Sequence, residues 1–428
     1  MINIQKKLFS SKSKILDLKN LSDKSIKDSI RLGKISQYNL ENELCKNNNS
    51  NYIKATRIRQ SLFREKSGNN FKIPIDKFNS NNFYEKILNK NCENVIGYIP
   101  IPVGCIGPIT INKEVCYIPM ATTEGALVAS TNRGCKALNN GIKSYVINDG
   151  MTRSPLVNFS SVQRSIEFKT WIENNFDLLK KTFNSTTKFG NLKSIKCNLA
   201  GINVYIRFNA TTGDAMGMNM LGKGSSKCLE EIKKYFPDMK ILSLSGNTCT
   251  DKKSSAINWI NGRGKSVIAE AIIDKNIVKN VLKTDVNSLI ELNYKKNLIG
   301  SSLAGSIGGF NAHASNIITS IFIATGQDPA QNIGSSNCMT LFEKLDDGNL
   351  HMSVTLPSLE VGTIGGGTGL PGQKECLKMM GINDTLLAGG NSKKLSMIIS
   401  GAVLAGELSL LSALTTDDLI KAHMKLNR

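Results

Sequence analysis

Four polar residues in this sequence have side chains that could catalyse one reaction together: Glu124, Lys252, Asp328 and His423. A carboxyl group that donates a proton near neutral pH needs burial or a neighbouring carboxylate to raise its pKa. Asp328 could be that second carboxylate for Glu124, and Lys252 could stabilise a developing oxyanion. Each residue also has a structural interpretation, since capping acids, turn residues, surface lysines and buried histidines are common. The residue types therefore indicate acid–base chemistry at an oxygen that becomes negative, without establishing it.

The element expected around the first of these residues is a helix. Thr122 or Thr123 can cap a helix that runs toward Leu138, which puts Glu124 in the first helical turn. There the positive end of the helix dipole favours an ionised carboxylate. A proton donor at this position therefore requires burial or a second acid.

The other three residues lie in a loop, a turn and a C-terminal segment. Lys252 belongs to the polar loop 245–253, which precedes a short helix. Asp328 follows a helix predicted over residues 312–324, and His423 lies on an apolar face after a good helix start. These residues can meet only through the tertiary structure.

Residues 155–245 are predicted to form a small unit. Their hydrophobic spacing alternates between strand and helix periods in the order β-α-β-β-α-β, which is the ferredoxin-like arrangement. The predicted elements cover 156–159, 162–183, 194–199, 203–208, 215–236 and 240–244. Such a unit would be an insertion in a larger domain that resumes near Ser245.

The composition indicates a globular chain. Its 428 residues, 40% of them hydrophobic, are enough for two or three domains. No run of about 18 apolar residues predicts a transmembrane helix, and the apolar segment 398–414, which contains Glu407, is predicted to be a buried core helix. Ten cysteines without a Cys-x-x-Cys pair, and only 3 histidines, argue against a metal site and a disulfide framework. That pattern favours a reducing compartment.

The formal charge of +20 calls for an anionic partner. Nucleic acid is one candidate, and a polyphosphate cofactor in a lysine-lined cleft is the other; the charge alone leaves both open. Residues 1–16 lack acids and mix Lys, Ser and apolar residues. This pattern is similar to an organelle transit peptide, except that it contains no Arg.

Two glycine-rich segments match phosphate-binding motifs in part. Residues 217–224 follow the P-loop pattern until Gly224 replaces the Ser or Thr that would bind magnesium. Residues 367–372 match Gly-x-Gly-x-x-Gly, but no βαβ unit surrounds them and Pro371 lies in the turn. Neither a P-loop nucleotide site nor a Rossmann fold is therefore expected. Residues 365–368 still provide backbone that a ligand could approach closely.

Seven blocks of the chain are informative when they are taken together: residues 93–102, 119–133, 149–153, 212–220, 251–253, 305–313 and 326–337. These blocks closely resemble the catalytic region of hydroxymethylglutaryl-coenzyme A (HMG-CoA) reductases of the eukaryote-like class. The resemblance runs from about Leu32 to Arg428. Their combination, rather than any single motif, identifies an enzyme.

The resemblance implies an α+β fold: a large mixed α/β domain with the inserted ferredoxin-like small domain, plus a helical N-terminal region. The implied segments are a basic leader at 1–20, the helical region at 21–93, the large catalytic domain at 94–154 and 245–414, the small NADPH-binding domain at 155–244 and a C-terminal catalytic flap at 415–428.

The implied reaction is the four-electron reduction of HMG-CoA to mevalonate and free coenzyme A with two NADPH and no metal, on the route to isoprenoids and sterols. By resemblance, Lys252 stabilises the oxygen of the hemithioacetal and aldehyde intermediates. Glu124 donates protons, and Asp328 couples to Glu124 and to Lys252 as one titrating set. His423 protonates the departing thiolate, which otherwise could add back to the aldehyde.

The resemblance also implies three groups of binding residues. Those expected around the glutaryl carboxylate are Arg153, Ser245, Asn247, Asp251, Lys253 and Lys296. Those expected to bind coenzyme A are Tyr38, Ser130, Asn132, Arg133, Lys283, His313 and Asn316. NADPH is expected across Lys188, Asp214, Met216, Gly217, Met218, Asn219, Gly366, Gly367 and Thr368.

The family places the Glu124 side and the Lys252 side of the site on different subunits, so a homodimer or homotetramer is expected, with residues 93–102 in the subunit contact. No membrane span and no nucleic acid are expected. The enzyme would be soluble, and either mitochondrial, from its basic N-terminus, or cytoplasmic.

The sequence departs from the family pattern at a few positions. Thr187-Lys188 replaces the usual Ser-Arg, so a 2′-phosphate would lose the bidentate guanidinium. Leu426 stands where the family often has His, and the chain stops at Arg428, without the regulatory serine of animal members. Phosphorylation control of that kind is therefore not expected.

Three alternatives are open to experiment. A degradative relative running in reverse would use NADH, although residues 214–219 favour NADPH. A nucleic-acid-binding protein would bind RNA at high salt and would not oxidise NADPH. An acyl-coenzyme A transferase would turn over without a change in NADPH absorbance.

Overall fold

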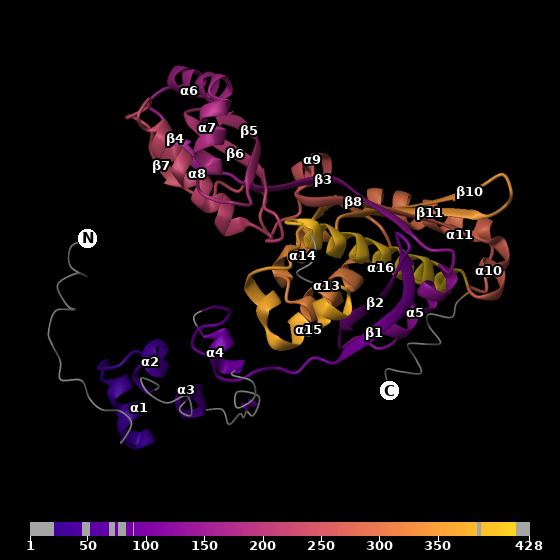
Figure 1. Ribbon diagram of the computed structural model, residues 1–428, viewed down its shortest axis with the longest axis horizontal. Coiled ribbons are helices and arrows are strands. Elements are labelled where there is room, and N and C mark those ends of the chain that lie inside the picture. Colours follow the sequence, from indigo (N-terminus) through magenta and orange to yellow (C-terminus); the bar gives the residue numbers. More distant parts are fainter. Residues whose placement is uncertain are drawn as a thin grey trace. The chain divides into compact units, whose positions relative to one another are not determined.

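The computed structural model describes residues 21–44, 52–67, 73–75, 83–88, 90–382 and 387–416 (Figure 1). The chain divides into two compact units, Met1–Pro100 and Ile101–Arg428. The first is helical in its described part, and the second combines helices with sheets. The predicted α+β class is thereby confirmed. The predicted leader and the C-terminal segment with His423 lie outside the described residues.

The N-terminal unit is built, in its described part, of short helices around a buried ion pair. Its elements are α1 (Asp23–Arg31), η2 (Gln37–Asn39), α2 (Leu40–Leu44), α3 (Tyr52–Ser67) and α4 (Phe83–Ile87). The fully buried guanidinium of Arg59 donates to the carboxylate of Glu41, to the hydroxyl of Tyr84 (3.1 Å) and to the carbonyl oxygen of Val95 (3.0 Å). A buried guanidinium is stable only when it is paired. Because the partners of Arg59 lie on different helices, these bonds connect α2, α3 and α4.

The second unit contains a hairpin, a large sheet and the helices that pack on them. The hairpin strands are β1 (Val103–Ile111) and β2 (Glu114–Ala121). The sheet has nine strands in the described part of the chain: β3 (Lys143–Arg153), β4 (Leu156–Asn158), β5 (Asn191–Ala200), β6 (Asn203–Thr211), β7 (Lys240–Ser243), β8 (Gly264–Ile273), β9 (Gly309–Phe310), β10 (Cys338–Lys344) and β11 (Leu350–Leu359). The helical elements are α5 (Leu127–Ala137), α6 (Val162–Asn174), α7 (Phe176–Asn184), α8 (Met218–Ile232), α9 (Ala256–Asn261), α10 (Lys275–Asn280), α11 (Val286–Leu292), η5 (Asn293–Gly300), α12 (Ser301–Leu303), α13 (Ala314–Thr325), η6 (Pro329–Gln331), α14 (Asn332–Ser335), η7 (Gly366–Gly369), α15 (Pro371–Met379) and α16 (Gly390–Thr415).

The long strand β3 connects two parts of the sheet (Figure 1). Its first residues, from Lys143 to Gly150, pair antiparallel with β8, and its last, Met151 to Arg153, pair with β6. Beyond β8 lie β11, β10 and β9, and beyond β6 lie β4 and β7, while β5 pairs with β6. The two parts of the sheet therefore meet at Gly150 and Met151, and Arg153 ends β3 beside β6.

The part of the sheet beyond β3 belongs to the predicted insertion. Its elements follow the order β4-α6-α7-β5-β6-α8-β7, and the strand order β7-β4-β6-β5 is that of a ferredoxin-like sheet. The single helix predicted over 162–183 is wrong, because Asn175 leaves helical geometry and separates α6 from α7. Helix α8 begins at Met218 rather than near Ala215, because Gly217 adopts a left-handed conformation, with φ of 98°. Separate hydrophobic clusters lie under this insertion and under the rest of the unit.

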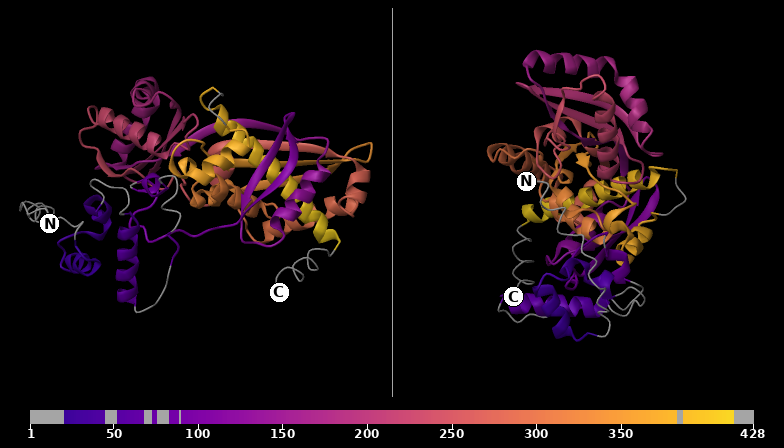
Figure 2. Two further views of the ribbon diagram at one scale, coloured as in Figure 1. Left: turned by 60° about the horizontal axis from the view of Figure 1, so that its bottom comes forward. Right: turned by 90° about the vertical axis from the view of Figure 1, so that its left-hand side faces the viewer.

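Helix α16 packs along the rest of the sheet and against α5 and α13 (Figure 2). Among the described residues it is the one helix whose length and composition would suit a membrane span, and 83% of that apolar window is buried within the protein. Glu407, in its middle, is fully buried and hydrogen-bonded. The core helix predicted from the apolar segment 398–414 is thereby confirmed.

A substitution at the crossing of α5 and α16 tests this packing. A Cβ atom at Gly134 would lie 1.9 Å from the carbonyl oxygen of Ala405, and neither backbone can move aside as a flexible side chain would. We expect Gly134→Ala to lower the free energy of unfolding by about 1–3 kcal/mol or more, measured by urea denaturation. The control is Gly222→Ala in α8, where an added Cβ meets no atom within 4 Å. That variant should be unchanged or stabilised by about 0.5–1 kcal/mol, and equal losses in both variants would contradict the close crossing.

Candidate active site

Lys252 lies in the loop between β7 and α9, and its ammonium group is paired. Its Nζ atom is 2.8 Å from Oδ2 of Asp328. That hydrogen bond raises the pKa of Lys252, so the side chain stays protonated at neutral pH. The other carboxylate oxygen of Asp328 accepts from the backbone N–H of Ala330 at 3.0 Å, which caps η6. Asp328 therefore caps the start of the turn that follows it, and its carboxylate also faces the lysine.

Glu124 lies in the loop before α5, not in the first turn of a helix. The helix predicted from Thr122 or Thr123 starts only at Leu127, because Ala126 adopts a left-handed conformation, with φ of 68°. The hydroxyl of Thr122 instead accepts from the N–H of Glu124 at 3.0 Å. The carboxylate is exposed, and it accepts from Nδ2 of Asn316 at 3.3 Å. Within the described part of one chain, the hydrogen bonds of Glu124 do not reach Asp328 or Lys252, so their predicted coupling stays a prediction.

The start of α13, from which Asn316 reaches Glu124, is fixed by α16. The carboxylate of Glu407 accepts from the backbone N–H groups of Ala312 (2.8 Å) and His313 (2.7 Å) and from the hydroxyl of Thr340 (2.8 Å). These bonds satisfy backbone N–H groups at the start of the helix that have no partner within the helix. The segment that carries two predicted coenzyme A residues is therefore anchored to the core.

Three further residues predicted to bind coenzyme A share α5. Ser130 and Arg133 bond to the hydroxyl of Ser409 on α16 at 3.0 and 3.1 Å. Oδ1 of Asn132 accepts from the backbone N–H of Gly107 at 2.9 Å. These contacts orient the helix. Lys283 is exposed after α10, and the side chain of Tyr38 lies outside the described part of the chain.

Most residues predicted for the glutaryl carboxylate lie on or beside the Lys252 loop. Ser245, Asn247, Asp251 and Lys253 are on the loop itself. Arg153 ends β3, and the next residue, Ser154, accepts from the N–H of Gly246 at 2.6 Å. The Nε atom of Arg153 is buried and has no hydrogen-bond partner among the described residues. Lys296 lies on η5 and is exposed.

The two segments predicted to bind NADPH lie side by side. Ala215 and Ile364 form a parallel β-bridge, and the N–H of Thr363 donates to the carbonyl oxygen of Asp214 at 2.7 Å. Gly367 packs directly on Gly326, two residues before Asp328, since a Cβ on either would clash with the other's backbone. The glycine loop therefore borders the segment that holds the Lys252–Asp328 pair.

The surroundings of these segments fit an anionic dinucleotide. Helix α8 begins at Met218, and its N-cap residue Gly217 provides no side-chain cap, which leaves N–H groups available at the positive end of the helix. Cβ atoms added at Gly365 or Gly366 would meet nothing within 4 Å, so the backbone is open to a ligand. Lys188 is exposed. The carboxylate of Asp214, however, is occupied: it accepts from the N–H groups of Gly389 and Ser392 at 3.0 and 2.8 Å, which caps α16.

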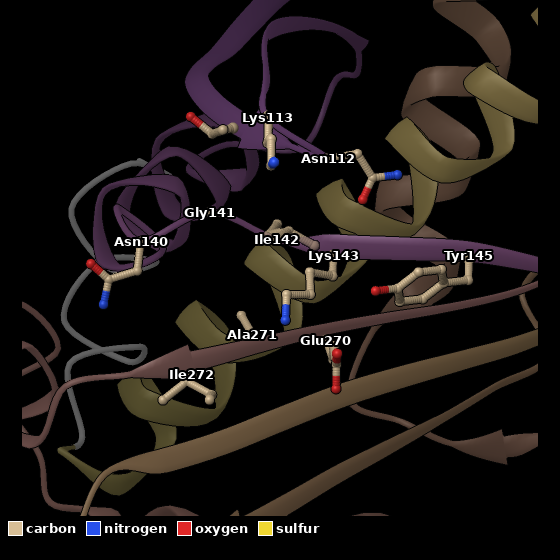
Figure 3. A pocket seen from close by; sticks show the side chains of 11 residues that line it. Asn112, Lys113, Asn140, Gly141, Ile142, Lys143, Tyr145, Glu270, Ala271 and Ile272 are labelled. Carbon is tan, nitrogen blue, oxygen red and sulfur yellow. The ribbon is translucent and has the colours of Figure 1, made fainter.

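A cavity of about 630 Å³ lies between the hairpin and the first half of β3 (Figure 3). Side chains from β3 and β8 form much of its lining, and none of the predicted site residues contributes to it. The lining residues are Thr110, Asn112, Lys113, Asn140, Gly141, Ile142, Lys143, Tyr145, Glu270, Ala271 and Ile272. The site therefore does not coincide with this cavity.

Sequence reasoning missed two buried charged residues that support the site. Arg263 and Glu360 lie beneath the Lys252 loop and are almost fully buried, whereas Glu407, which lies beneath α13, belongs to the core helix that the sequence predicted. Asp251 accepts from Arg263 at 3.2 Å. The only available signal was the pair of glycines around Arg263, which both adopt positive φ. No cluster of His, Cys, Asp and Glu suited to a metal occurs among the described residues.

Residues 55–428 match the family model described as hydroxymethylglutaryl-coenzyme A reductase. A 3-hydroxy-3-methylglutaryl-coenzyme A reductase 2 of Gossypium hirsutum is 52% identical over 94% of this chain and 64% of its own length. Reductase 1 of Hevea brasiliensis is 50% identical over 99% and 73%, and reductase 2 of Dictyostelium discoideum is 57% identical over 83% and 68%. The chain thus spans about two thirds to three quarters of these relatives.

A solved structure supports the fold. The class II reductase of Streptococcus pneumoniae, described as bound to NADPH in open conformations, aligns with a TM-score of 0.62 at 18% identity and covers 85% of this chain and 86% of its own. The family model, the curated relatives and the fold agree. The chain belongs to the hydroxymethylglutaryl-coenzyme A reductase family.

Proposed function

We propose that this chain reduces HMG-CoA to mevalonate and free coenzyme A, with two NADPH as co-substrates. Family membership supports the proposal. The observation that carries it is the Lys252 ammonium, held 2.8 Å from Asp328 beside the segments around Asp214 and Gly367. The test is oxidation of NADPH in the presence of HMG-CoA, which requires no oxidant other than the thioester and the aldehyde derived from it.

Different residues of this chain are proposed to have different roles in the reaction. NADPH supplies the hydride in each of the two steps. Lys252 stabilises the negative charge that develops on the carbonyl oxygen, because a fixed cation in a partly enclosed site needs no reorganisation. Glu124 donates the proton that this oxygen finally takes. His423, beyond the described residues, is proposed to protonate the coenzyme A thiolate before the aldehyde is reduced.

The binding residues support the same substrates. The cationic side chains around the Lys252 loop suit the free carboxylate of the glutaryl group. Residues of α5 and the start of α13 are proposed to bind coenzyme A. Residues 155–244 are proposed as the NADPH-binding domain, within a large catalytic domain formed by 94–154 and 245–414, and residues 415–428 as the flap that carries His423.

We also propose a homo-oligomer, dimer or tetramer, with active sites between subunits. The extended segment 93–102 supports this, since Ile99 is 83% exposed and the segment pairs with no strand in the described part of the chain. The compartment stays a prediction from residues 1–16, and localisation of the tagged chain in cells would decide between mitochondria and cytoplasm.

Cofactor preference is tested at Lys188. We expect Lys188→Ala to raise the KM for NADPH about tenfold and to leave the KM for NADH unchanged, because only NADPH carries the 2′-phosphate that this cation would bind. Lys181→Ala, another exposed lysine of the same domain, is the control. A parallel rise for both cofactors would place the 2′-phosphate elsewhere.

The same assay separates the alternatives. A degradative relative would prefer NADH at neutral pH. A transferase would release free coenzyme A with no loss of NADPH absorbance. A nucleic-acid-binding protein would retain RNA at high salt and leave NADPH unoxidised.

A further inference from the structure

Arg263 is a fully buried arginine that the reaction, as described, does not use. It lies between α9 and β8, and its side chain is 0% exposed. The flanking glycines, Gly262 and Gly264, have φ of 71° and 73°. A Cβ on Gly264 would lie 2.5 Å from the carbonyl oxygen of Leu359, so the backbone here is tightly enclosed. A guanidinium buried in such a place is stable only if it forms several well-directed hydrogen bonds with paired groups.

The partners of Arg263 come from both segments that carry the Lys252–Asp328 pair. Its Nη2 atom donates to Oδ1 of Asp251 at 3.2 Å, and Asp251 immediately precedes Lys252. Its Nη1 atom donates to Oε1 of Gln331 at 3.3 Å, and Gln331 ends η6, the turn that Asp328 caps.

The two segments are also joined to each other below the ion pair. Nε2 of Gln331 donates to the same Oδ1 atom of Asp251 at 2.8 Å. Arg263, Asp251 and Gln331 therefore form a closed hydrogen-bonded triangle. Lys252 itself has a positive φ of 58°, a conformation that a non-glycine residue keeps only when its surroundings hold it. The triangle provides that restraint directly next to the lysine.

Glu360 balances the charge of the guanidinium. Its carboxylate accepts from Nη1 of Arg263, and both side chains are completely buried. Oε1 of Glu360 has no hydrogen-bond partner among the described residues. Burial raises the pKa of the Glu360 carboxyl to about 7, although Arg263 opposes that change. The fold thus keeps a buried acid next to Arg263, although burial of that acid costs stability. Apolar residues at both positions would avoid this cost.

Arg263 also touches the domain proposed to bind NADPH. Its Nη2 atom lies 3.0 Å from Sδ of Met218, the first residue of α8, and its Nε atom donates to the hydroxyl of Thr152 on β3 at 3.0 Å. One side chain therefore contacts the lysine loop, the aspartate turn, the long strand and the start of α8.

We propose that Arg263, charge-balanced by Glu360, is a positioning residue that fixes Lys252 and Asp328 relative to each other through Asp251 and Gln331. It does not touch the substrate. Its removal displaces the ammonium from the position of the oxygen that becomes negative. A displacement of about 1 Å lowers the rate up to roughly a hundredfold with little effect on binding. This inference rests on the proposed reductase function.

The test is steady-state kinetics of Arg263→Lys and Gln331→Leu in the full chain. Lysine keeps the charge at 263 but has one donor nitrogen in place of the planar fork, so it cannot reproduce the separate bonds that Nε, Nη1 and Nη2 of Arg263 make. We expect Arg263→Lys to lower kcat about 10- to 100-fold, with KM for HMG-CoA and for NADPH within about threefold of wild type. Gln331→Leu leaves Arg263 and Glu360 in place and should lower kcat about three- to tenfold. Rates are expressed per NADPH-binding site, counted by fluorescence titration, so that unfolded protein does not count as slow enzyme.

The matched control is Arg59→Lys. Arg59 is an equally buried arginine with a carboxylate and a hydroxyl as partners, and it lies in the N-terminal unit. Its substitution should lower the thermal midpoint but leave kcat per binding site unchanged. If Arg263→Lys and Gln331→Leu keep wild-type kcat per site, or lose it no more than Arg59→Lys, the positioning role is refuted. If the wild-type chain itself does not oxidise NADPH with HMG-CoA, the proposed function fails instead, so the two failures are distinct.

Discussion

Replacing Lys252 with alanine is expected to lower kcat by roughly a thousandfold, because the variant loses the cation nearest the oxygen that becomes negative. The Lys252 ammonium lies 2.8 Å from Asp328, and its raised pKa keeps it charged throughout the neutral range. A loss confined to kcat would mean that the cation acts in the transition state, whereas a rise in KM alone would mean ground-state binding. NADPH oxidation at varied HMG-CoA concentrations measures both parameters.

Two further variants show whether position and chemistry both matter. Lys227 is an exposed lysine of α8, paired with Glu230 at 2.9 Å. The Lys227→Ala enzyme should retain the wild-type kcat. Lys252→Arg keeps the charge but spreads it over a planar group, so we expect it to recover only part of the rate. A Lys252→Ala enzyme within about threefold of the wild-type kcat would exclude this lysine from oxyanion stabilisation.

The fold was predictable where burial determines the pattern. The apolar segment 398–414 and the alternating periods of residues 155–245 identified α16 and the order of the strands, because both periods follow from which side chains face the core. The errors arose where the backbone conformation of a single residue determines where a helix begins or ends. Ala126 is left-handed and delays the start of α5, and Asn175 separates α6 from α7. The sequence does not indicate that Ala126 is left-handed. Nothing nearby in the sequence therefore argued against the predicted helix cap at Thr122 or Thr123.

The candidate site was predictable only in its motifs. Lys252 and its neighbours lie in one short loop, and the NADPH segments carry recognisable glycines. The supports beneath them were not predictable. Arg263 is one of 54 lysines and arginines, and its two flanking glycines indicate a tight turn without indicating that the side chain is buried. Asp214 belongs to a predicted NADPH segment, yet its carboxylate caps α16, a contact 175 residues away in sequence.

Replacing Glu124 with glutamine should lower kcat by about a hundred- to ten-thousandfold, because the amide has no proton to donate in the pH range of the reaction. Glutamine can still accept the hydrogen bond from Nδ2 of Asn316, so the loop and KM should change little. The control is Glu343→Gln, which changes an exposed acid on β10. We expect this variant to keep the wild-type kcat. If Glu124→Gln retains kcat within about threefold, the proton comes from another group.

Glu124 also tests whether the active site lies between subunits. If Glu124 and Lys252 of one site come from different subunits, a hybrid of inactive Glu124→Gln and Lys252→Ala chains contains one site with both native residues. Random mixing of the two variants should then restore about a quarter of the wild-type activity, since half of the dimers are hybrids and each hybrid has one intact site. The chains must be co-expressed or refolded together so that subunits exchange. If mixed oligomers form and no activity returns, both residues act within one chain, and the interface proposal is wrong even though each single variant is inactive.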